Sequence, residues 1–176
     1  MSNTQDLNRI ELFDKTMGRY ITNEFRQFLI NKGFFNAPAS TKYHGNYFGG
    51  LFDHSYNVTK ELCNLTKHSE WQVERSPYIV GMFHDLCKID SYAYNEDKQM
   101  FEHNNDVLID GHGSKSIIYL SRYINLTEEE ALCIRWHMGA FDDKENWNYY
   151  TKAVQKYENV LWTHTADMVV SQVMGV

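Results

Sequence analysis

The sequence predicts a single all-α domain, and three observations support this. Apolar side chains recur at three- and four-residue steps in several long segments, as they do on one face of a helix. Segments with the alternating pattern of a strand are few. A chain of 176 residues with 43% apolar and 15% aromatic residues suffices for one hydrophobic core and is too apolar for a disordered chain.

The first predicted element is an amphipathic helix over residues 7–32, and Gly33 is expected to end it. We expect residues 1–33 to form an N-terminal helix that packs on one globular unit of residues 34–176. Residues 34–50 combine glycines, turn formers and aromatic residues without a periodic pattern, which predicts an ordered loop.

The middle of the chain alternates helical and non-helical segments. A helix is predicted over residues 51–67. The pair Ser76-Pro77 is typical of an N-cap followed by proline at the first helical position, and it predicts a helix through about Ile89. Residues 91–110 alternate polar and aromatic residues without a helical stripe, so we expect a short hairpin or a long loop there.

Four further helices are predicted in the last third of the chain. Residues 114–123 have helical character again. Residues 127–130 have the sequence of a capping box, which predicts the start of a helix that runs to His137. Two more helices are expected over residues 150–157 and 159–173.

Charge and cysteine content restrict the class of partner. The formal net charge of −6 provides no overall attraction to nucleic acid or to an anionic membrane. Cys63, Cys87 and Cys133 have no paired spacing, so neither a disulfide framework nor a cysteine-based zinc site is predicted. An odd thiol count fits a reducing compartment. Because neither a signal peptide nor a membrane-spanning apolar run is visible, we expect a cytoplasmic protein without a membrane partner.

A series of polar residues recurs about once per predicted helix, with sequence separations of 25 to 30 residues. A helical bundle can bring such side chains together at one interior site. Imidazole and carboxylate ligands suit divalent ions, among which Mn²⁺, Fe²⁺, Co²⁺, Ni²⁺, Zn²⁺ and Mg²⁺ are not distinguished by the sequence. Six candidates exceed the needs of one tetrahedral ion and suit two ions that share a carboxylate. The candidate ligands are His54, His84, Asp85, His112, His137 and Asp167.

Each of these histidines, taken alone, could have a structural role instead of binding a metal. A single histidine is more often a hydrogen-bonded core or surface residue than a ligand. His68 is expected at a solvated helix end, and His103 in a polar loop without a chemical role.

The ordered set of candidates resembles the signature of the HD-domain metal-dependent phosphohydrolases. The flanking segments are similar as well: GGLFDHSYNV around the first histidine, FHDLCKI around the His-Asp pair and THTADM around the last aspartate. The resemblance runs from about Pro38 to the end of the chain.

Within that superfamily, the segments PASTKYHGNYFGGLFDHS, GHGSKSI and WHMG are most similar to the HD domain of bacterial 3′–5′ exoribonucleases and related small hydrolases. Those exoribonucleases have a nucleic-acid-binding barrel before the HD domain, whereas here one predicted helix precedes it. They often have two consecutive histidines where this chain has His137 and Met138. A long nucleic acid is therefore not the expected substrate.

The resemblance implies a single HD-domain helical bundle, and it implies which ligands bind each of two metal ions. His54, His84, Asp85 and Asp167 would hold one metal ion. Asp85 would also bridge to a second ion, completed by His112 and His137.

Further candidates surround this set, and each has a structural alternative. The resemblance implies that Lys88 contacts phosphate and stabilises developing negative charge. Alternatively, Lys88 is a lysine at a helix C-terminus, where its charge interacts favourably with the helix dipole. His44 could protonate a leaving group or bind substrate, or anchor its loop. Tyr47 could stack on a base or pack. Arg135 and Lys115 could bind phosphate or be surface charges.

Two residues adjoin the candidate ligands in sequence. His164 could orient a ligand or serve in helix packing. Asp53 could hydrogen-bond a ligand imidazole or cap its helix.

The expected function is that of a phosphodiesterase or phosphomonoesterase in which metal-activated water attacks a nucleotide or a small nucleic-acid-derived phosphoester. A 3′–5′ exonuclease acting on short oligonucleotides is an alternative. A non-catalytic nucleotide-binding sensor and a helical scaffold without a site are further alternatives. The sequence leaves the exact substrate and the oligomeric state open.

Overall fold

The computed structural model describes residues 4–109 and 111–176, and these form a mostly helical domain with one small sheet. Residues 1–3 of the expected N-terminal segment and residue 110 of the expected hairpin segment lie outside the described residues. The α-helices of the described residues are α1 (Thr4–Met17), α2 (Asn23–Asn31), α3 (Gly50–Leu65), α4 (Ser76–Phe83), α5 (His112–Leu120), α6 (Glu128–Trp136), α7 (Trp147–Lys156) and α8 (Asn159–Met168).

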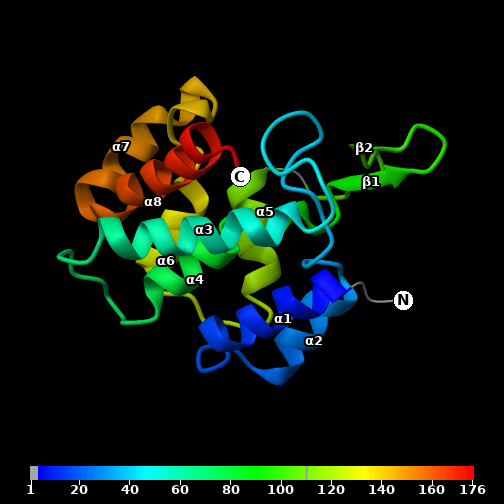
Figure 1. Ribbon diagram of the computed structural model, residues 1–176. Coiled ribbons are helices and arrows are strands. Elements are labelled where there is room, and N and C mark those ends of the chain that lie inside the picture. Colours follow the sequence, from blue (N-terminus) through cyan, green and yellow to red (C-terminus); the bar gives the residue numbers. More distant parts are fainter. Residues whose placement is uncertain (1–3, 110) are drawn as a thin grey trace.

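Shorter elements connect or extend these helices. Strands β1 (Tyr92–Asn95) and β2 (Met100–His103) pair antiparallel in a hairpin that projects from the helices (Figure 1). The hairpin expected in this region is therefore confirmed over its described residues. Three 3₁₀ helices span Leu86–Ile89, Gly139–Phe141 and Lys144–Asn146, and a π-helix over Val169–Met174 continues α8.

Helix α3 crosses the middle of the molecule, with α1 and α2 on one side of it and α7 and α8 on the other (Figure 1). It contacts α1, α4 and α8, and α6 contacts α4, α5 and α8. The N-terminal helices belong to the same core, because Phe13 of α1 and Phe25 of α2 are fully buried and both pack against Phe83 of α4. In the described part of the chain, no helix is both long and apolar enough to cross a membrane.

The single helix expected over residues 7–32 is wrong, because the chain forms α1 and α2 with a turn between them. Thr22 has extended backbone angles and its hydroxyl accepts the N–H of Phe25 at 3.2 Å, which starts α2. The turn allows both amphipathic helices to bury their apolar faces. Gly33 has a φ of +76° and ends α2, as expected.

The continuous helix expected from Ser76 to Ile89 is also wrong. Helix α4 stops at Phe83, and Asp85 leaves the helical conformation with φ −102° and ψ 19° before the 3₁₀ helix begins. Ser76 is the first helical residue rather than the N-cap, and its hydroxyl donates to the carboxylate of Glu130 at 3.1 Å.

Other sequence-based expectations about elements are confirmed. The capping box at Thr127 is formed, and α6 runs from it to Trp136. Residues 34–49 are an ordered loop ahead of α3, and α5 begins at His112, two residues before its expected start.

Candidate metal centre

The six predicted ligands lie on or directly after five different helices, and they meet beside one cavity. His54 lies on α3, His84 and Asp85 directly follow α4, and His112 begins α5. His137 directly follows α6, and Asp167 lies near the end of α8. The cavity has a volume of about 520 Å³, and its lining includes Asp85, His112 and Asp167. The helical bundle therefore brings these segments together, as their spacing predicted.

His84 and His137 are held by the same local geometry. Each is the residue that ends its helix, and its ring Nδ1 bonds to the carbonyl three residues earlier: Gly81 for His84 at 2.9 Å and Ile134 for His137 at 2.8 Å. A carbonyl only accepts hydrogen bonds, so Nδ1 carries the proton. In the neutral form of each ring, the Nε2 lone pair is therefore free to bind a metal.

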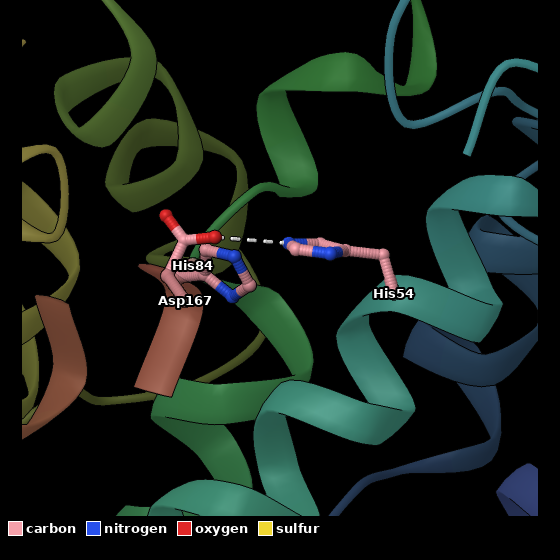
Figure 2. Close-up of side chains that lie close together, drawn as sticks. All are labelled: His54, His84 and Asp167. Atoms are coloured by element: carbon pink, nitrogen blue, oxygen red, sulfur yellow. Dashed lines mark ion pairs between the residues drawn. The ribbon is translucent and has the colours of Figure 1, made fainter. Parts of the chain in front are cut away.

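His54 has the same tautomer through a distant partner. Its Nδ1 bonds to the carbonyl of Val176 at 2.8 Å. Its Nε2 lies 3.2 Å from Oδ1 of Asp167, and Figure 2 shows this pair beside the ring of His84.

The two oxygens of Asp85 face different pairs of histidines. Oδ2 lies 3.6 Å from Nε2 of His84 and 3.9 Å from Nε2 of His54. Oδ1 lies 3.4 Å from Nε2 of His137 and 3.9 Å from Nδ1 of His112. This is the arrangement that a carboxylate needs to contact two cations at once.

Several of these inward-facing atoms have no hydrogen-bond partner. They are Nε2 of His54, His84 and His137 and Oδ1 of Asp85, all in residues at most 2% exposed. A buried polar atom without a partner costs roughly 1–3 kcal/mol, so native proteins contain only a few per 100 residues. Four at a single point fit an arrangement that a metal ion completes.

Among the described residues, two groups of side chains are compact enough to hold a metal ion. In each, the ligand atoms lie within 4.8 Å of one another. The first group is His54, His84 and Asp167, and the second is Asp85, Cys87 and His112. Cys87 was not among the residues predicted from the sequence, because cysteine ligands are recognised there by paired spacing. Its position two residues after Asp85 is the signal that the sequence offers.

Lys88 forms the closest charged contact in the site. Its Nζ lies 2.6 Å from Oδ2 of Asp85, and it lines the cavity. Burial alone would raise the pKa of Asp85, but the charge of Lys88 and the surrounding imidazoles holds it well below its usual range. Burial likewise opposes the charge of Lys88, and Asp85 outweighs it and raises the pKa of the ammonium group. The pair is therefore fully ionised at neutral pH.

The histidines differ in their proton affinity. Burial lowers the pKa of His84 to about 4, so its ring is neutral at pH 7, as a metal ligand must be. For His137, burial also favours the neutral form, but contact with Asp85 outweighs it and raises the pKa. Burial, with smaller contributions from His54 and Lys88, lowers the pKa of His44 to about 4.

His44 and His164 extend the site around the ligands. His44 lines the cavity, its ring centroid lies 4.8 Å from that of His54, and neither of its ring nitrogens has a partner. His164 also lines the cavity, and its Nδ1 bonds to the carbonyl of His137 at 2.8 Å. His164 therefore positions the backbone of one candidate ligand.

The remaining candidates lie outside this cavity. Tyr47 is 43% exposed and does not line it. Arg135 bonds to Asp142 at 2.6 Å and faces a smaller neighbouring cavity of about 260 Å³. Lys115 is buried in an ion pair with Asp90. Asp53 neither bonds a ligand imidazole nor caps α3; it forms a two-point ion pair with Arg9 at 2.9 and 2.8 Å.

Aromatic side chains that were not predicted as site residues border the cavity. Tyr43 and Phe141 line it while being 79% and 68% exposed, and Tyr92 of the hairpin lines it as well. Tyr43 adjoins His44 in the loop before α3, and Phe141 follows His137 by four residues, so both lie close in sequence to selected residues.

Comparison with known proteins does not assign the chain to a family. Neither a protein-family model nor a curated protein nor a solved structure matches it.

Proposed function

We propose that this protein is a metal-dependent phosphohydrolase of the HD-domain type that acts on a nucleotide or a small nucleic-acid-derived phosphoester. The observation that carries the proposal is the position of Asp85, whose two oxygens each face a different pair of imidazoles. The unpartnered Nε2 atoms around it supply neutral ligands for divalent ions.

Two ions fit this ligand set. His54, His84 and Asp167 would hold the first, with Asp85 as a shared ligand, and His112 and His137 would complete the second. When bound, such ions polarise phosphoryl oxygens and lower the pKa of a coordinated water, which supplies the nucleophile for phosphoester hydrolysis.

The other side chains of the cavity would bind the substrate. Lys88 reaches the cavity beside Asp85, where its ammonium group would contact a phosphoryl oxygen and offset the negative charge of the transition state. His44 is neutral at pH 7 because its pKa is about 4, so it fits a hydrogen-bonding contact to the substrate better than the role of a protonated acid.

The dimensions and borders of the cavity favour a small substrate. A volume of about 520 Å³ is within the range of pockets for small molecules. Tyr43 and Phe141 present exposed rings at the cavity, where a nucleobase could stack. The net charge of −6 argues against a long polyanionic substrate. A short oligonucleotide cleaved from its 3′ end is the alternative substrate.

The proposal is tested by measuring bound metals in the purified protein and assaying a panel of nucleotides and short oligonucleotides with Mn²⁺ added. The Asp85→Ala variant is expected to lose at least about 10- to 100-fold in turnover, because removing a ligand costs at least as much as removing a residue that supports one. Asp97→Asn, at an exposed residue of the hairpin turn, is the matched control and is expected to keep full activity.

Two results would contradict the proposal. Full activity in Asp85→Ala would assign the hydrolysis to another protein in the preparation. Full metal occupancy without turnover of any phosphoester would favour a nucleotide-binding module instead.

A further inference from the structure

Cys87 lies among the candidate ligands of the second ion. It belongs to the 3₁₀ helix that follows Asp85 and is 1% exposed. Its Sγ lies 3.4 Å from Nδ1 of His112. Its backbone N–H donates to the hydroxyl of Ser116 at 2.9 Å, so α5 holds both Cys87 and His112 in this arrangement.

Two further buried atoms point to a cation at the same place. Oδ1 of Asp85 and Nε2 of His137 are 3.4 Å apart, and neither has a hydrogen-bond partner. Their residues are 2% and 0% exposed. Oδ1 of Asp85 also lies 3.9 Å from Nδ1 of His112, on the side of the carboxylate away from Lys88. This half of the site thus contains a carboxylate, two imidazoles and a thiol.

We infer that Cys87 is a thiolate ligand of the second metal ion, together with Asp85, His112 and His137. The inference rests on the metal centre of the proposed function. As the sulfur–metal bond forms, the thiol proton passes to solvent, because a coordinating thiol is deprotonated. One soft ligand beside a carboxylate and imidazole makes this half of the site selective for Zn²⁺ or Co²⁺ over Mg²⁺.

The alternative role of Cys87 is a thiol that only hydrogen-bonds to His112. In that arrangement the sulfur orients the imidazole, and the metal is bound by nitrogen and oxygen alone. The two roles differ in whether a sulfur–metal bond exists, which spectroscopy detects without reference to activity.

Cobalt substitution tests the inference. The protein is loaded with Co²⁺ after removal of other metals, and its near-ultraviolet absorption is recorded under reducing conditions. The wild type is expected to show a thiolate-to-cobalt charge-transfer band. Cys87→Ser should lose the band, and Cys63→Ser, which changes a thiol that belongs to neither group of candidate ligands, should keep it.

A second measurement does not depend on a variant that folds. X-ray absorption of the zinc-loaded wild type is expected to show a sulfur neighbour at about 2.3 Å.

The outcomes separate the inference from the proposed function. If the wild type binds neither cobalt nor zinc, both the inference and the metal centre fail. If it binds them with only nitrogen and oxygen neighbours and no charge-transfer band, the thiolate ligand fails while the metal centre stands. A band that persists in Cys87→Ser and vanishes in Cys63→Ser would also overturn the assignment.

Discussion

At the scale of residues, the site depends on how the consecutive side chains of His84 and Asp85 both point into the candidate metal centre. Consecutive side chains on a helix point about 100° apart. The chain resolves this conflict by ending α4 at Phe83 and turning at Asp85. The turn lets the imidazole and the carboxylate face the same point, and it brings Lys88 to within 2.6 Å of Asp85.

The buried imidazoles also predict how stability depends on pH. The pKa of His84 is lowered to about 4 in the fold, below the value of about 6.5 for an unfolded histidine. The unfolded chain therefore binds the proton more readily, so folding is destabilised as pH falls from about 6.5 to about 4. The contribution of His84 reaches about 3 kcal/mol at the acid end of this range.

We expect the metal-free protein to lose free energy of unfolding over that pH range, measured by urea denaturation in the presence of a chelator. His44 acts in the same direction, and His137, whose pKa is raised, acts in the opposite direction. In His84→Gln the pH dependence should be shallower, whatever the stability of the variant at pH 7. An unchanged slope would show that His84 does not titrate in this way.

At the scale of elements, two of the candidate ligands lie where helices end. His84 and His137 follow α4 and α6, and each bonds to the carbonyl three residues earlier. Helix α6 is held to α4 through Glu130, which is fully buried and accepts from Ser76 and from the backbone of Thr127. The capping box that starts α6 thereby also connects the two helices that carry these histidines.

The distance between α3 and α4 depends on Gly81. A Cβ atom there would lie 2.5 Å from the Cα of Thr59, so the two helices would have to separate. We expect Gly81→Ala to lower the free energy of unfolding by about 1–3 kcal/mol, measured by urea denaturation. Lys152→Ala, at an exposed position on α7, is the control and should change stability by less than about 0.5 kcal/mol.

Gly81→Ala should weaken metal binding as well, because His54 lies on α3 and His84 follows α4. A variant as stable as the wild type would show that the helices tolerate the added methyl group.

At the scale of the whole molecule, the ligands connect five helices that are distant in the sequence. A metal ion that binds only the folded state increases the free energy of unfolding by RT ln(1 + [M]/Kd). This increase is about 2.7 kcal/mol when the concentration of the free ion is 100 times Kd. We expect Mn²⁺ or Zn²⁺ to raise Tm relative to the chelated protein in thermal unfolding.

The His54→Gln variant should lose most of this metal-dependent stabilisation. His103→Gln, at an exposed hairpin residue, should retain it. An equal rise in Tm in both variants would place the bound ion elsewhere.

The sequence by itself determined where several elements begin or end and which residues are candidate ligands. The end of α2 at Gly33, the capping box at Thr127 and the hairpin depend on local backbone preferences. A short segment has these preferences without contacts to the rest of the chain. The set of histidines and aspartates was visible because their separations match one residue per helix.

Only the tertiary structure decided which candidates meet and in which protonation state. The break at Asp85, the partner of each Nδ1 atom and the approach of Cys87 to His112 depend on contacts between helices. Arg135 forms an ion pair with Asp142, and Lys115 forms one with Asp90. The spacing of these residues along the chain does not reveal the two ion pairs. Tautomers and distances are set by packing, because the atoms that fix them belong to segments far apart in the sequence.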